Sequence, residues 1–454
     1  MAWGTGPWTQ RVGGLRALIA VTVSLLAACG HPASRADSPL PKIVVAGTSS
    51  LVDADYDIRV SGLPPESTVV VTLSSRDYLQ EKWTSAIRVT ASSNGTVDLG
   101  GAAPLPGGAY TGAHAMGLQD QLRPSSGCGG GCLFYPPTGS STETLTVSTP
   151  GRVLATANIT RTTSLPGEHL IHLASPDQPF QGSLFSPPLG GQPHSAVLLI
   201  GGSEGGVAFG GLAAALASHG HPVLAIAYFG LPGLPQHLSA IPLEYFLPAL
   251  RYLRAAPGVD ASRVFTMGVS RGSEAALLLA AHYPSLVHGA IGYVPSAVVN
   301  GAADSTSGSA WTINGRPLPF LPVTPAAVAV GPHGLVERGT FADALTNGPA
   351  EQAALIPVLG IRGPVFLAAG GDDQLWPSDR YAELIRRARP RSAANDVTLV
   401  YPQAGHALGL AEPDLATGTT SNVDGTVLDL GGTVEADAQA RRDAWPRLLT
   451  FLTG

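Results

Sequence analysis

The chain has 454 residues, which is longer than one ordinary domain and predicts two. Hydrophobic residues make up 44% of it, so the chain can bury sizeable cores, and wholesale disorder is excluded despite the 56 Gly and 39 Pro. The net charge is −6 and no run of Lys and Arg could follow a phosphate backbone, so we do not expect nucleic acid as a partner.

Residues 1–29 have the pattern of an export signal. Arg11 and Arg16 precede the apolar run ALIAVTVSLLAAC, which is too short for a comfortable membrane-spanning helix. The run ends in LAAC, which resembles the bacterial lipobox, where the Cys, here Cys29, is lipidated and becomes the first mature residue. We therefore expect an extracytoplasmic protein that is lipid-anchored to the bacterial cell membrane, with residues 30–42 as a tether. A secreted protein released by ordinary signal cleavage is the alternative.

Residues 43–165 are predicted to form an antiparallel β-sandwich domain. Short β-rich runs alternate polar and apolar residues, are separated by turn-rich pieces such as SGLPPES, and show no long helical period. This alternation suits strands with one face in water. The runs are YDIRV, STVVVTLSS, AIRVTAS, ETLTVST and RVLATANIT.

The same domain contains Cys128 and Cys132 in the segment SSGCGGGC. Outside the cytoplasm, a close and even pair of cysteines predicts a disulfide, which here would pin one Gly-rich loop. A zinc site is disfavoured because no second Cys/His pair stands at ligand spacing, and no other cluster implies a metal or cofactor.

Residues 166–454 are predicted to form an α/β domain. Apolar strand-like runs alternate with helical stretches, which is typical of a parallel sheet covered by helices on both faces. The strand-like runs are AVLLIGG, PVLAIAY, RVFTMGVS, HGAIGYV, PVFLAAG and DVTLVYP, and the helical ones include GLAAALASHG and PLEYFLPALRYLRAA.

A Gly-rich loop, GGSEGG at 201–206, follows the first of these strands and precedes a helical run. Such a loop either cradles a phosphate or supplies a backbone N–H to an oxyanion. It lacks the G-x-G-x-x-G spacing and a Walker lysine, so we expect Gly202 and Ser203 to provide an oxyanion donor.

The sequence Gly268-Val269-Ser270-Arg271-Gly272 follows the strand VFTM and precedes the helical run SEAALLLAAHYP. This is the pattern of a nucleophile elbow, a strand-to-helix turn so tight that only small residues fit two positions either side of the nucleophile. We predict that Ser270 is the nucleophile and that the N–H of Arg271 is the other oxyanion donor.

A serine nucleophile needs a base and a group that orients the base, and in this fold both follow the serine in the order acid, then His. GGDD at 370–373 follows a late strand, and His406 follows the last one. The spacing from Gly370 favours Asp373 as the acid, which leaves Asp372 as a loop residue.

Together these segments resemble the acyl-CoA thioesterase and bile acid-CoA:amino acid N-acyltransferase family. The matches run in order over nearly all of the mature sequence and include YDIRVSGLPPESTVVVTLSS, AVLLIGGSEGG, MGVSRGSEAALLLA, GPVFLAAGGDDQLWPS and YPQAGHAL. The resemblance implies an α/β-hydrolase catalytic domain behind an N-terminal β-sandwich, and a triad of Ser270, Asp373 and His406.

The chain departs from this family pattern in three respects. The amino-acid-conjugating members tend to use Cys as nucleophile, so Ser270 favours hydrolysis. Glu204 stands in the oxyanion loop where a Gly is usual, which predicts a carboxylate near the mouth of the site. The family's familiar members act inside cells, whereas this chain carries an export signal.

We therefore expect a serine hydrolase that cleaves an acyl thioester or ester through an acyl-serine intermediate, without a cofactor or a protein partner. Two alternatives stay open. The first is an acyltransferase that passes the acyl group to an amine or alcohol, and the second is a non-catalytic lipid-anchored binding protein on a hydrolase fold.

Overall fold

The computed structural model describes residues 40–454 apart from short gaps, and these residues form one compact unit. The predicted signal peptide, Cys29 and most of the predicted tether lie outside the described residues. The gaps are residues 48, 129–130, 138, 189–191, 304–307, 323–327, 390–394, 413–415 and 424.

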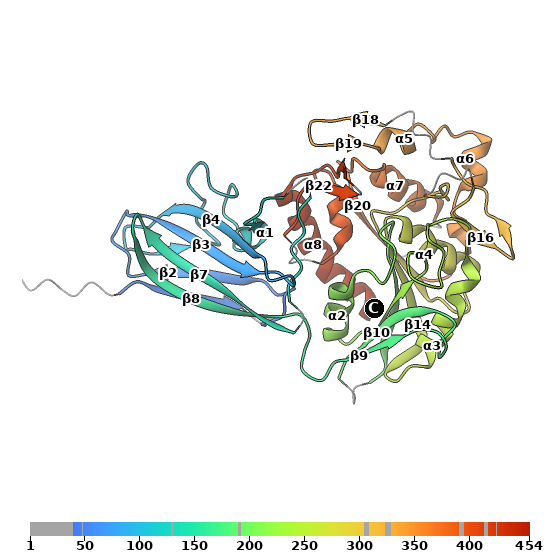
Figure 1. Cartoon of the computed structure of the whole chain (residues 1–454), viewed down its shortest axis with the longest axis horizontal. Coiled ribbons are helices and arrows are strands. Elements are labelled where there is room, and N and C mark those ends of the chain that lie inside the picture. Colours follow the sequence, from blue (N-terminus) through green and yellow to red (C-terminus); the bar gives the residue numbers. More distant parts are fainter. Residues whose placement is uncertain are drawn as a thin grey trace, which may run out of the picture. The chain divides into compact units, whose positions relative to one another are not determined.

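The N-terminal part contains two antiparallel sheets, ordered β1-β2-β5 and β6-β4-β3-β7-β8 (Figure 1). Their strands alternate buried and exposed residues, so one face of each sheet reaches a shared core that contains Ile58, Val71 and Trp83. The predicted antiparallel β architecture is confirmed. The elements are β1 (Lys42–Gly47), β2 (Tyr56–Ser61), β3 (Thr68–Arg76), β4 (Lys82–Thr90), β5 (Val97–Asp98), α1 (Gly117–Asp120), β6 (Arg123–Pro124), β7 (Ser140–Thr149) and β8 (Arg152–Thr162).

The C-terminal part is built on an eight-stranded sheet with the order β21-β20-β15-β14-β11-β12-β10-β9. Six of these strands run parallel to one another, which confirms the predicted α/β class. They are β11, β12, β14, β15, β20 and β21. The strands are β9 (His169–Leu173), β10 (Gln181–Ser186), β11 (His194–Ile200), β12 (Val223–Ala227), β14 (Val259–Val269), β15 (Gly289–Tyr293), β20 (Val365–Gly370) and β21 (Val397–Tyr401).

Two strands of this sheet were not predicted. β9 and β10 pair antiparallel with each other, and β10 also pairs antiparallel with β12. Strand β9 lies at the sheet edge, where most of its side chains are exposed. Without a continuous apolar run, it lacks the sequence signal that marked the buried strands.

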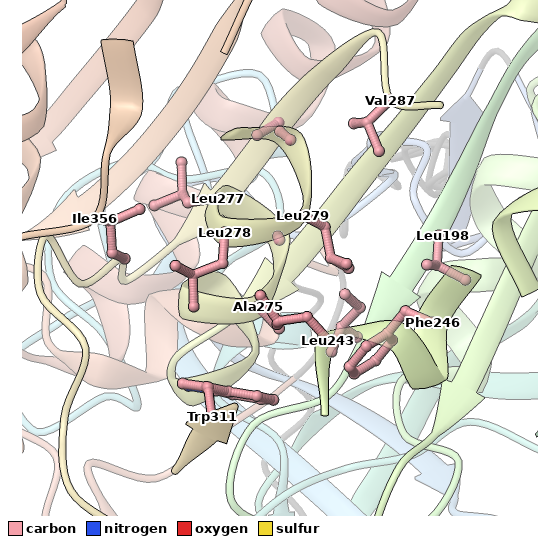
Figure 2. Close-up of a cluster of buried hydrophobic side chains, with 14 of the residues drawn as sticks. Leu198, Leu243, Phe246, Ala275, Leu277, Leu278, Leu279, Val287, Trp311 and Ile356 are labelled. Carbon is pink, nitrogen blue, oxygen red and sulfur yellow. The ribbon is translucent and has the colours of Figure 1, made fainter. Parts of the chain in front are cut away.

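The parallel strands read as unbroken apolar runs because both faces of the sheet are covered. In β11, Ala196, Leu198 and Ile200 join one buried cluster, whereas Val197 and Leu199 join the other. Figure 2 shows part of the first cluster. Each aliphatic side chain buried in this way contributes roughly 1.5–3 kcal/mol to stability.

The main helices divide between the two faces. α3 (Phe246–Ala255), α4 (Arg271–His282) and α7 (Ser378–Ala388) contribute to the first cluster, and α2 (Gly210–Ser218) and α8 (Val434–Thr453) contribute to the second. None of the helices in the described part of the chain combines the length and the hydropathy that crossing a membrane requires.

Smaller elements connect the main strands and helices. Most fall between β15 and β20, and they supply part of the cavity described below. They are β13 (Ile241–Pro242), η1 (Leu243–Tyr245), β16 (Trp311–Ile313), β17 (Arg316–Pro317), β18 (Ala329–Val330), β19 (Leu335–Val336), α5 (Arg338–Ala342), α6 (Pro349–Ala354), η3 (Val358–Gly360), η4 (His406–Leu410), β22 (Thr420–Val423) and β23 (Thr426–Asp429).

Candidate active site

Ser270 lies at the turn between β14 and α4, with φ of 52° and ψ of −124°. A non-glycine residue at positive φ is strained, and the flanking glycines make the turn possible. A Cβ on Gly268 would lie 2.0 Å from the carbonyl oxygen of Gly272, and one on Gly272 would lie 2.3 Å from that of Gly201. The two glycines of the motif are therefore a steric requirement.

The structure brings Ser270, His406 and Asp373 together in one hydrogen-bonded chain. His406 Nε2 lies 3.1 Å from Ser270 Oγ, and His406 Nδ1 lies 2.9 Å from Asp373 Oδ2. This is the geometry in which a base can take the serine proton while a carboxylate fixes the ring. All three residues follow the carboxyl ends of parallel strands, β14, β20 and β21.

The two neighbouring aspartates occupy different environments. Asp373 is fully buried, and its Oδ1 also accepts hydrogen bonds from the backbone N–H groups of Leu375 and Trp376. Asp372 is exposed and accepts hydrogen bonds from Gln374 Nε2 and the N–H of Gly432. Only Asp373 contacts His406, whereas Asp372 links the loop after β20 to the loop that contains Gly432.

The predicted oxyanion loop, residues 201–206, packs against the turn that contains Ser270. The Glu204 carboxylate accepts a hydrogen bond from one of the two backbone N–H groups that were predicted to bind the oxyanion. The N–H of Gly202 donates to Glu204 Oε1 at 2.8 Å. The N–H of Ser203 has no acceptor within the described residues, and Ser203 lines the cavity that contains Ser270 and Arg271. The Gly202 N–H is therefore occupied, which leaves the N–H groups of Ser203 and Arg271 as the candidate oxyanion donors, and Gly202 packs beside Ser270.

The Glu204 side chain stabilises the loop to which it belongs, residues 201–206, through its contacts with Gly201 and Gly202. The residue as a whole is exposed, but its carboxylate turns back onto Gly201 and Gly202, and this burial raises its pKa. The positive charge that His406 can carry lowers the same pKa, because the two groups are close enough to interact.

The Arg271 side chain is buried next to the turn that contains Ser270, where an ion pair and hydrogen bonds hold it in place. Its guanidinium forms a buried ion pair with Glu274, at 2.9 Å, and donates to the carbonyl oxygen of Gly301. Glu274 in turn accepts hydrogen bonds from Asn300 and from the indole N–H of Trp311. The Arg271 guanidinium is therefore paired within the protein and is not available to the cavity as a free cation.

Asp437 of α8 supports the histidine loop and was not identified from the sequence. Its Oδ1 accepts the N–H of Gly405 at 2.7 Å, next to His406. The residue is fully buried, and this burial raises its pKa to about 7 against the attraction of Arg441. Its position in a helix with mixed polarity carries no sequence signal for this role.

A cavity of about 250 Å³ opens onto Ser270 and His406. Beyond the predicted residues it is lined by side chains that the sequence did not single out. These are Ala302, Ala303, Glu337, Phe341, Leu375 and Trp376.

A larger cavity of about 950 Å³ contains none of the triad residues. It is lined by Phe265, His288, Pro364 and Val397, which lie at the amino ends of the parallel strands. Catalytic groups of open α/β sheets gather at the opposite, carboxyl ends, so the smaller cavity is the candidate site.

Cys128 and Cys132 are joined by a disulfide in the N-terminal part, outside the triad. Within the described ranges, no group of three or more His, Cys, Asp or Glu side chains is placed to hold a metal ion.

Comparisons with known proteins match both parts of the chain. Residues 53–173 match the model described as the acyl-CoA thioester hydrolase/BAAT N-terminal region, and residues 241–454 match the BAAT/acyl-CoA thioester hydrolase C-terminal model. Together the two models span well over half of the chain.

The chain aligns with similar curated proteins over almost the full length of both. The chain is 27% identical to mouse acyl-coenzyme A amino acid N-acyltransferase 1 over 424 residues, covering 90% of this chain and 96% of that protein. It is 28% identical to human acyl-coenzyme A thioesterase 1 over 404 residues, covering 88% and 93%.

Among solved structures, a Klebsiella pneumoniae protein assigned as a dienelactone hydrolase covers 63% of this chain and 98% of its own, with 18% identity and a TM-score of 0.39. On the two family matches, the chain belongs to the acyl-CoA thioesterase/BAAT family, with both its N-terminal and its C-terminal regions.

Proposed function

We propose that the protein hydrolyses acyl thioesters or esters through a covalent acyl-Ser270 intermediate. The hydrogen-bonded chain from Asp373 through His406 to Ser270 is the observation that carries this proposal. Membership of a family that contains thioesterases supports it. A serine nucleophile also favours hydrolysis over transfer, because its ester intermediate is a weaker acyl donor to an amine than a cysteine thioester.

The proposed reaction has two steps. Ser270 Oγ attacks the acyl carbon as its proton passes to His406 Nε2, and the N–H groups of Ser203 and Arg271 stabilise the oxyanion. His406 then gives the proton to the leaving thiol or alcohol. In the second step His406 activates a water molecule, which releases the acid and restores Ser270.

Replacing Ser270 by Ala tests this function. We expect the variant to lose labelling by a fluorophosphonate probe and to lose turnover of p-nitrophenyl butyrate by about 10³-fold or more, because the nucleophile is absent. Ser262→Ala, at an exposed position of strand β14 and away from the triad, is the matched control and should behave like the wild type. Labelling that persists in Ser270→Ala would place the nucleophile elsewhere.

Product analysis separates hydrolysis from acyl transfer. Wild-type protein is incubated with an acyl thioester in the presence and absence of an added amine or alcohol. We expect free acid as the product in both cases. An acylated amine or alcohol formed in its place would identify the protein as a transferase.

We further propose that Cys29 is lipidated and holds the protein at the membrane outside the cytoplasm, on the strength of the LAAC motif that follows the apolar run. Cys29→Ser should abolish incorporation of radiolabelled palmitate in the bacterial host and move the protein from the detergent phase to the aqueous phase. Unchanged partitioning of the variant would argue against a lipid anchor at this residue.

A further inference from the structure

The hydroxyl of Tyr228 binds the oxyanion loop from the interior of the protein. It lies 2.9 Å from the carbonyl oxygen of Gly201 and 2.9 Å from that of Gly202, so its single hydrogen is shared between two acceptors. Within the described ranges, no other donor reaches the Gly202 carbonyl oxygen. The loop is therefore attached to the core at the two residues that precede Ser203.

The Gly202–Ser203 peptide transmits this attachment to the candidate oxyanion donor. The carbonyl oxygen of Gly202 and the N–H of Ser203 belong to one planar trans peptide, in which they point in opposite directions. Because the oxygen points toward Tyr228 in the core, the N–H points away from the core. Ser203 lines the cavity that contains Ser270, and its N–H has no acceptor among the described residues. The Tyr228 hydroxyl thus determines which way this N–H faces.

The preceding peptide, between Gly201 and Gly202, is bonded at both ends. Its carbonyl oxygen accepts a hydrogen bond from Tyr228, and its N–H donates to Glu204 Oε1 at 2.8 Å. The two neighbouring peptides therefore share one hydroxyl donor, but only the second has an N–H left for an oxyanion.

Tyr228 is itself held in place by aromatic packing. It directly follows β12, is 2% exposed, and lies with its ring centroid 5.0 Å from that of Phe229 and 5.6 Å from those of Phe246 and Trp311. Figure 2 shows Phe246 and Trp311 in the same buried cluster. Burial raises the pKa of the Tyr228 hydroxyl well above its usual value, so the group keeps its proton and remains a donor.

Other contacts hold the loop without this hydroxyl. The carbonyl oxygen of Phe229 accepts the N–H of Gly206 at 2.9 Å, and the bond between Glu204 and Gly202 lies within the loop. Neither contact reaches the Gly202 carbonyl oxygen. Removing the Tyr228 hydroxyl should therefore free the orientation of one peptide and leave the loop folded.

We propose that Tyr228 is a positioning residue, which aims the Ser203 N–H at the oxyanion through its hydrogen bond to the Gly202 carbonyl oxygen. The inference rests on the acyl-Ser270 intermediate proposed above and deepens its oxyanion step. Tyr228 does not line the cavity, so it acts through the loop. Negative charge develops on the acyl oxygen only as Ser270 attacks, so a misdirected donor weakens transition-state binding and leaves substrate binding nearly unchanged.

Tyr228→Phe tests this role, because it removes the hydroxyl and keeps the ring and its packing. With p-nitrophenyl butyrate, we expect kcat to fall about 10- to 100-fold and KM to stay within about twofold. The loss should be smaller than the 10²- to 10³-fold, roughly, that removal of a whole oxyanion donor costs. A rise in KM with unchanged kcat would overturn the proposal.

A tetrahedral inhibitor measures the same interaction without turnover. Butylboronic acid adds to a catalytic serine and forms a tetrahedral anion, which resembles the transition state. Its inhibition constant should rise in Tyr228→Phe by about the factor that is lost in kcat. If kcat and the inhibition constant both keep their wild-type values, Tyr228 does not position the donor.

Tyr245→Phe is the matched control. The Tyr245 hydroxyl donates to the carbonyl oxygen of Ala227 at 2.7 Å and accepts the N–H of Gln181 at 3.1 Å, so this variant also loses a tyrosine hydroxyl that is bonded to the backbone. It should keep kcat and the inhibition constant within about twofold, because these bonds do not involve the loop at 201–206. Urea denaturation shows that both variants fold. Equal losses of kcat in the two variants would assign Tyr228 a general packing role instead.

The boronic acid measurement also separates this inference from the proposed hydrolysis, because it needs Ser270 and the oxyanion donors but no acyl acceptor. If product analysis shows acyl transfer and Tyr228→Phe still weakens boronic acid binding, the hydrolase proposal fails and the positioning role stands. If Ser270→Ala abolishes hydrolysis and Tyr228→Phe leaves the inhibition constant unchanged, the hydrolase proposal stands and the positioning role fails.

Discussion

Two adjacent carboxylates, Asp372 and Asp373, occupy different environments, and only Asp373 belongs to the hydrogen-bonded chain that reaches Ser270. Asp373 is enclosed, accepts two backbone N–H groups and contacts the His406 ring. Asp372 points to solvent and binds Gln374 and Gly432. Two identical side chains one residue apart therefore have different surroundings, and we propose a catalytic role for Asp373 only.

Asp373→Asn should lower kcat for p-nitrophenyl butyrate by about 10³- to 10⁴-fold, because an amide cannot stabilise the imidazolium or fix the same tautomer. Asp372→Asn is the matched control and should retain activity within about twofold, since its contacts lie outside the triad. Steady-state kinetics on the two purified variants make the comparison. A larger loss in Asp372→Asn would identify that residue as the orienting acid.

At the scale of elements, the junction of β14 and α4 depends on close approach of backbones. Gly272 lies so near Gly201 that a side chain would meet its carbonyl oxygen, and the same contact presses the oxyanion loop against the elbow. The strained Ser270 conformation is held by this packing and by the bond from its N–H to the carbonyl oxygen of Tyr293, at 3.0 Å. The elbow and the loop therefore form one unit.

Gly272→Ala should lower the free energy of unfolding by about 2 kcal/mol or more and greatly reduce turnover, because the added methyl group forces the loop and the helix apart. Gly101→Ala provides the control, since a Cβ there meets nothing within 4 Å. Urea denaturation of the variants measures the difference. Similar stability of the two variants would mean that the elbow tolerates the displacement.

At the scale of the whole molecule, the last helix contacts the loop that contains His406 in the candidate active site. Thr433 caps the N-terminus of α8, and its side-chain oxygen accepts a hydrogen bond from the N–H of Ala436. One turn further along the helix, the Asp437 carboxylate accepts a hydrogen bond from the N–H of Gly405. A buried carboxylate with a pKa near neutrality couples the folding of this helix to pH.

Asp437 should make the protein less stable as the pH rises from about 4 to 7. Over that range the folded chain retains a proton on Asp437, whose pKa is raised from 3.8 to about 7, whereas the unfolded chain has released it. Relative to Asp437→Asn, the wild type should lose on the order of 2–4 kcal/mol of unfolding free energy across this interval. Chemical denaturation at several pH values measures the change. A pH-independent difference would show that the buried carboxylate does not titrate there.

The sequence was sufficient for features that depend on local pattern. The strand-turn-helix context of Ser270, the order in which Asp373 and His406 follow it, and the apolar runs of the parallel strands are all visible in one dimension. Each reflects a rule of short range or of chain order, namely steric limits at a turn and burial of a sheet on both faces.

Tertiary structure alone decided the rest. Nothing in the sequence indicated that Glu204 engages the N–H of Gly202, that Asp437 supports Gly405, or that Glu337 lines the cavity beside His406. These residues come from separate parts of the chain, and their roles arise from distance and burial after folding. The sequence by itself thus determined the reactive groups and the fold that carries them, whereas the packing of distant segments determined the charge and shape around the reacting bond.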